Sequence, residues 1–74
     1  MKELDTVVLL RPLPEYNLVA GDVGAVVHVH GPDGYEVEFV SGEETTLAVA
    51  TLGPEDLRPI DGPEVLHVRP LSRP

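Results

Sequence analysis

Two histidines and two glutamates alternate with apolar residues on either side of a short turn. In the stretch HVHGPDGYEVEF, His28 and His30 precede the turn, and Glu36 and Glu38 follow it. Imidazole nitrogens and carboxylate oxygens bind zinc and other transition metals, and they also catalyse proton transfer. The stretch therefore raises two chemical hypotheses, a metal site and an acid–base site.

The turn predicts the register of this hairpin. Pro32-Asp33-Gly34 is typical of a type I turn that ends in a glycine bulge. Such a turn sets two cross-strand pairs, His30–Glu36 and His28–Glu38. The other face of the hairpin then collects four apolar residues: Val27, Val29, Val37 and Phe39. A slip of one residue would mix charged and apolar side chains on both faces, so the alternation favours this register.

The predicted geometry favours a structural interpretation of the four polar residues. Cross-strand pairs of opposite charge contribute about 0.2–1 kcal/mol each, which explains the residues without a function. A flat sheet face spreads side chains that a tetrahedral metal site needs to converge, so His28, His30, Glu36 and Glu38 are metal candidates only by residue type. An open face also lacks the pocket that shifts a catalytic pKa. We therefore expect no enzyme activity and no cofactor.

Two other features are candidates for contact with a partner. Tyr16 lies in a long loop, where it either packs over one end of the fold or meets a partner. Acidic residues gather in two predicted turns, where they form either a solvated surface or a patch for a basic partner: Glu43, Glu44, Glu55 and Asp56. Two tyrosines without tryptophan make a poor groove for proline-rich peptides.

Composition limits the classes of function. The 74 residues suit one small domain, and the absence of cysteine excludes disulfides and thiolate metal sites and fits a cytoplasmic protein. The acids near the start and the short apolar run that follows them lead us to expect no signal peptide, and no apolar run in the sequence reaches membrane-spanning length. The net charge of −8, from 13 acids and 5 bases, disfavours nucleic acid as a partner and suits a basic protein.

The pattern of valine, threonine, glycine and proline predicts an all-β fold. The expected strands cover residues 4–10, 23–30, 35–40, 45–52 and 58–60, with one helical turn at 53–57 before the last strand. A long first loop and five short strands are typical of a small SH3-like barrel, here predicted for residues 1–60. Residues 61–74 are proline-rich, and two alternatives stay open for them: an edge strand over 64–69 docked on the barrel, or a mobile end.

Several motifs resemble one known family. The stretches AGDVGAVVHV, YEVEFV and TLAVATLGPEDLRPI resemble a small bacterial family defined only as domain of unknown function 4926, over roughly residues 2–60. The Gly-Asp-x-Gly-x-Val pattern is more distantly similar to KOW motifs and to the SH3-like accessory subunit of photosystem I. The closer family implies an SH3-like barrel, and it implies no activity and no functional residues.

These observations together predict a non-catalytic accessory or protein-interaction module, an acidic partner of a basic protein or toxin. The first alternative is a KOW-like module associated with nucleic acid or the ribosome. The second is a small metal-binding protein that uses the His/Glu face of the hairpin. An exposed edge strand would also permit self-association.

Overall fold

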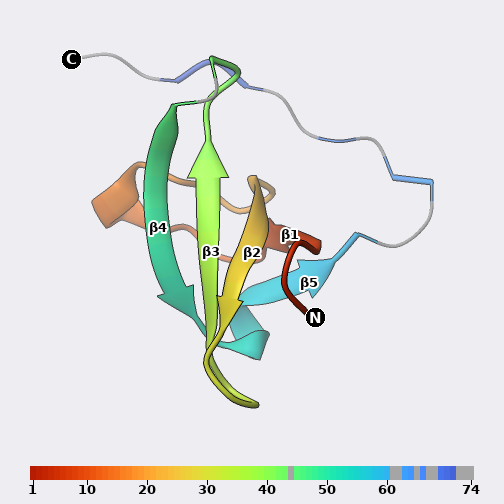
Figure 1. The fold of residues 1–74 in the computed structure, drawn as a ribbon. Coiled ribbons are helices and arrows are strands. Elements are labelled where there is room, and N and C mark those ends of the chain that lie inside the picture. The colour runs from red at the N-terminus through yellow and green to blue at the C-terminus, as the bar shows by residue number, and fades with distance from the viewer. Residues whose placement is uncertain (44, 61–62, 65, 67–68, 72–74) are drawn as a thin grey trace.

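The computed structural model describes residues 1–43, 45–60, 63–64, 66 and 69–71. One antiparallel sheet has the strand order β4-β3-β2-β1-β5 (Figure 1). Its strands are β1 (Thr6–Leu9), β2 (Val23–Val29), β3 (Tyr35–Val40), β4 (Thr46–Leu52) and β5 (Leu57–Pro59). Two 3-10 turns, η1 (Pro14–Tyr16) and η2 (Pro54–Asp56), interrupt the connections. In this described part, no helix is long and apolar enough to cross a membrane.

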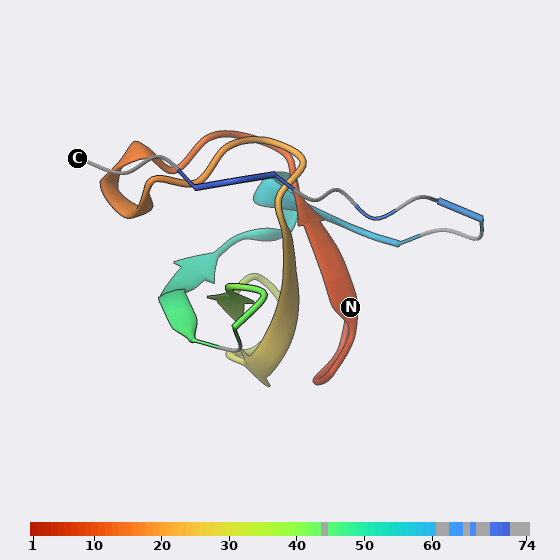
Figure 2. The ribbon, with the colours of Figure 1, turned by 90° about the horizontal axis from the view of Figure 1, so that it is seen from above.

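The all-β prediction is confirmed, including the helical turn that precedes the last strand. The sheet curls strongly when it is seen from above (Figure 2). Among the described residues, however, β4 pairs only with β3 and β5 pairs only with β1. The sheet is therefore curved and open, and it does not close into a barrel through strand pairing.

Buried and more exposed residues alternate along β3 and β4, so one face of the sheet carries the core. Its most deeply buried large side chains come from three strands: Phe39, Leu9, Val7, Val26 and Val37. The prediction that Phe39 belongs to the core is confirmed. Gly24 lies so close to β3 that a β-carbon there would come within 2.7 Å of Val37 Cγ1 and 2.9 Å of Phe39 Cε1. A side chain at position 24 would therefore displace the centre of the core.

The predicted register of the β2–β3 hairpin is wrong. In the structure His28 pairs with Glu36 and Val29 pairs with Tyr35, and a bulge lies between Val26 and His28. The bulge adds an unpaired residue, Val27, so the two faces of β2 exchange at that point. Val27 is consequently 39% exposed, and Val26 takes the core position that the alternation assigns to Val27.

Glu64 and Arg69, among the described residues of the 61–74 segment, make ion pairs with the rest of the chain. Glu64 binds Arg58, with 2.7 Å between Oε1 and Nη2, and Arg69 binds Asp22. The predicted edge strand over 64–69 falls partly outside the described residues. Its described members, Glu64, Leu66 and Arg69, are not in a strand.

Candidate functional site

The hairpin brings three of its four candidate polar residues together. The side chains of His30 and Glu36 meet, with 2.9 Å between Nε2 and Oε1, although the strand pairing sets Glu36 opposite His28. His28 lies edge-on to His30, with ring centroids 4.4 Å apart. The nearest carboxylate to His28 in an ion pair is that of Glu3, whose Oε2 is 3.9 Å from Nδ1. The predicted His28–Glu38 pair is therefore replaced by a loose contact with the N-terminal segment.

Glu38 makes a hydrogen bond to β4 instead of pairing with His28. Its Oε2 accepts a hydrogen bond of 2.6 Å from the Thr46 hydroxyl on β4. Across the described ranges, no three histidine, aspartate or glutamate side chains converge as a ligand group. The bulge at Val27 explains the separation, because it moves Glu38 opposite Ala25 rather than opposite His28.

The partner candidates separate into exposed and buried residues. Tyr16 is exposed on η1, and Glu43 and Glu55 are exposed in the turns that precede and follow β4. Glu44 lies outside the described residues. Asp56 is buried, at 8% exposure, so it does not belong to the exposed acidic surface predicted for the turns.

Asp56 joins two loops that are distant in the sequence. Its Oδ1 accepts a 2.6 Å hydrogen bond from Arg11 Nε, and its Oδ2 accepts a 3.1 Å bond from the backbone N–H of Gly53. The hydrogen bond from Arg11 is the main reason that the pKa of Asp56 lies below its usual value, although burial opposes the shift. The bond to Gly53 is half of a capping box, and an acid at the third position of η2 signals it in the sequence. Nothing local in the sequence signals Arg11 as its partner.

Asp22 is the second buried carboxylate, and it shapes a turn. Its Oδ2 accepts the backbone N–H of Val19 at 2.9 Å, and Gly21 beside it has a φ of +97°. Aspartate beside glycine is a common turn residue, because its side chain accepts a backbone N–H within the turn. Arg69 then binds both carboxylate oxygens, with Nε–Oδ1 at 2.8 Å and Nη2–Oδ2 at 2.7 Å. The sequence does not predict this long-range pair.

The two edges of the sheet differ in how well they are protected. β5 has only three residues, and they include Arg58 and Pro59. A short edge strand with a charge and a proline pairs poorly with a strand of another chain. β4 has seven residues, TLAVATL, without a charge or a proline. Its outward side chains include Val49, which is 45% exposed. A register shift near its start leaves residues 48–52 as the regular stretch of this open edge.

Acidic residues surround the open edge of β4. Glu43 precedes the strand, Glu55 follows it, and Glu36 and Glu38 lie on the neighbouring strand β3. The sequence contains no lysine or arginine between Arg11 and Arg58. The three arginines with described partners bind carboxylates of the chain itself: Arg11, Arg58 and Arg69. Among the described residues, the acidic side chains from β2 to β4 therefore have no lysine or arginine in an ion pair, and they lie beside a strand that pairs on one side only.

Comparison with known proteins places the chain by its sequence. No curated protein and no solved structure gives a significant match. Residues 3–59, which include all five strands, fit the family described as a domain of unknown function (DUF4926). The match covers most of the chain, and the chain therefore belongs to the DUF4926 family.

Proposed function

We propose that this chain is a non-catalytic protein-interaction module that binds a basic, extended segment of another protein along β4. The observation that carries the proposal is the open, uncharged edge of β4 with acidic residues on both sides of it. An extended segment added to such an edge gains main-chain hydrogen bonds, and side-chain contacts select its sequence. The acidic surroundings favour lysine or arginine in that segment and increase its rate of encounter.

We also propose that the fold is an open variant of the SH3-like barrel. The support is the long first loop, the 3-10 turn η2 before the last strand, and the pairing of β5 with β1. An experimental structure whose strands superpose on SH3-like domains in this order would support the assignment. A different order of strands around the core would oppose it.

The substitution Val49→Lys tests the binding edge. Val49 is exposed on β4, so a lysine there leaves the core intact, blunts the edge and repels a basic segment. Val27→Lys is the matched control, because Val27 has similar exposure and lies at the bulge of β2, in the interior of the sheet. Both variants change the net charge equally.

The measurement is affinity capture from native lysate with quantitative mass spectrometry, using the wild-type chain and both variants. We expect one or a few basic proteins to be captured by the wild type and by Val27→Lys, and lost with Val49→Lys. Equal loss in both variants would mean that net charge alone governs binding. Retention in both variants would exclude the β4 edge. Melting curves of all three proteins establish that they are folded to the same extent.

A further inference from the structure

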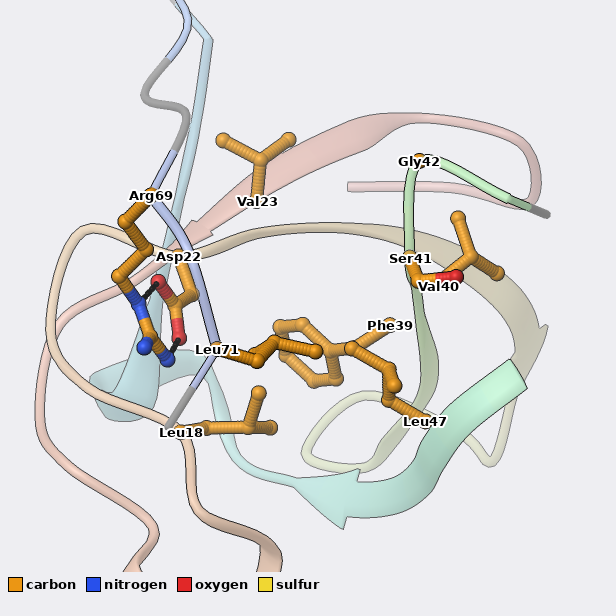
Figure 3. A pocket seen from close by; sticks show the side chains of 10 residues that line it. All are labelled: Leu18, Asp22, Val23, Phe39, Val40, Ser41, Gly42, Leu47, Arg69 and Leu71. Carbon is orange, nitrogen blue, oxygen red and sulfur yellow. Dashed lines mark hydrogen bonds and ion pairs between the residues drawn. The ribbon is translucent and has the colours of Figure 1, made fainter. Parts of the chain in front are cut away.

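A small cavity lies where the 18–23 turn, the end of the β3–β4 hairpin and residues 69–71 meet (Figure 3). Its volume is about 250 Å³. One end is polar and is formed by Asp22. The rest of the wall is mostly apolar and includes Leu18, Val23, Phe39, Val40 and Leu47.

Arg69 and Leu71 contact this cavity as the side chains of a bound peptide would. The Arg69 guanidinium makes a bidentate pair with Asp22 and also donates to the Asn17 carbonyl at 3.2 Å. Bidentate pairs with a carboxylate are geometrically specific for arginine. Two residues further on, Leu71 lines the apolar part together with Phe39 (Figure 3). The cavity, which is open along one side and is called the groove below, thus accepts a guanidinium at one end and an apolar side chain at the other.

Leu71 fills the apolar part incompletely. It is 40% exposed, whereas Phe39 in the same wall is 2% exposed, and the cavity persists beside it. Pockets for drug-sized ligands begin at roughly 300 Å³, so this volume suits one side chain better than a small molecule. A side chain larger than leucine would therefore bury more apolar surface at the same place.

We infer that this groove is a docking site for an extended segment with arginine followed two residues later by a bulky apolar residue. Arg69-Pro70-Leu71 occupies the site in cis, and a partner segment of the same chemistry enters by displacing it. The acidic domain attracts such a basic segment. The site is distinct from the open edge of β4 and shares only Leu47 with that strand. It is therefore tested separately from the proposed function.

A peptide-binding measurement in full-length protein tests the inference. The probe is a fluorescent peptide with the sequence of residues 66–74, LHVRPLSRP, titrated at about 150 mM salt, near physiological ionic strength. A segment tethered in cis has an effective concentration of roughly millimolar, so the wild type should bind the probe weakly. Arg69→Ala weakens the tethered competitor, and we expect it to bind the probe about tenfold more tightly, or better, than the wild type does. Arg73→Ala removes the same charge and should leave the affinity at the wild-type value.

Two altered probes test the chemistry of recognition. With Arg69→Ala protein, a probe with alanine in place of its first arginine should lose at least about tenfold in affinity, because it cannot pair with Asp22. A probe with phenylalanine in place of its second leucine should bind more tightly than the parent probe, because it fills the cavity. Equal binding of the parent and alanine probes would overturn the inference, as would Arg69→Ala protein that binds the parent probe no better than the wild type.

Substitutions in the groove complete the test. Asp22→Asn in the Arg69→Ala background should abolish binding of the probe, while its amide oxygen still accepts the Val19 N–H. If this variant is unfolded by circular dichroism, Leu47→Ser replaces it, since Leu47 is partly exposed and its loss weakens only the apolar wall. Unchanged binding in the folded variant would overturn the inference. A wild-type dimer in sedimentation that Arg69→Ala dissociates would also overturn it, because the groove would then serve the 61–74 segment of a second copy.

Discussion

Removal of the Asp56 carboxylate should destabilise the domain, although the residue lies in a surface turn. Asp56→Ala leaves the Gly53 N–H without its side-chain acceptor, and losing such a cap typically costs about 0.5–2 kcal/mol. The pair with Arg11 adds less than its 2.6 Å length suggests, because the Arg11 side chain is 55% exposed and water screens it. For a domain of this size, we expect the melting temperature to fall by roughly 5–15 °C.

Two comparison variants separate the cap from general charge effects. Asp56→Asn keeps an oxygen acceptor for Gly53 and loses the charge, so it should destabilise less than Asp56→Ala does. Glu55→Gln removes the same charge from the adjacent, exposed residue and should change the melting temperature little. Equal melting temperatures for Asp56→Ala and Glu55→Gln would refute the reasoning.

The pH dependence gives an independent check on Asp56. Its pKa is lowered in the folded protein, chiefly by the hydrogen bond from Arg11, and the reference value is 3.8. A carboxylate with a depressed folded pKa contributes stability above its unfolded pKa, and that contribution is lost as pH falls through the folded pKa. The difference in unfolding free energy between wild type and Asp56→Ala should thus be constant from pH 7 to 5 and shrink below about pH 4. Urea titrations measure it, and a difference that grows on acidification would contradict the assignment.

Three further predictions concern the core and the choice of partner. Phe39→Ala should cost about 3–5 kcal/mol and leave the domain largely unfolded at 37 °C, as circular dichroism would show; a melting temperature near the wild-type value would exclude Phe39 from the core. Gly24→Ala should cost about 1–3 kcal/mol in chemical denaturation, because its β-carbon would overlap Val37 and Phe39. Gly42→Ala, with nothing within 4 Å of its β-carbon, is the control and should be nearly neutral. We expect no micromolar binding to RNA or duplex DNA at about 150 mM salt in a fluorescence titration, and salt-sensitive micromolar binding would favour the KOW-like alternative.

Local patterns in the sequence predict the strands well and their register less well. Alternation and turn residues locate β3 at residues 35–40 and identify Phe39 as core. The bulge at Val27 has no such signature, because both Val26 and Val27 are apolar and either can face the core. Which of the two valines faces the core depends on the pairing of β2 with β3 and on the close approach of Gly24 to β3. Both are properties of the assembled sheet.

The candidate sites show the same division between local and distant causes. The exposure of Tyr16 and Glu55 follows from their positions in turns. The burial of Asp22 and Asp56 follows from arginines 47 and 45 residues away in the sequence. A carboxylate in a turn is normally solvated, and only a partner of opposite charge makes its burial favourable. The sequence does not show which carboxylate each arginine binds, and that pairing decides which carboxylates are buried.

The distribution of charge connects stability with recognition in this chain. Arg11 and Arg69 each bind a buried carboxylate, and Arg58 binds Glu64, so these cations tie loops and the described residues Glu64 and Arg69 to the rest of the domain. Because they are engaged within the chain, they do not neutralise the acidic residues around β4. A basic segment that binds there would supply the missing counter-charge, whereas a second copy of the chain would add its own net charge of −8. Electrostatics thus favours a heterologous basic partner over self-association through the same edge.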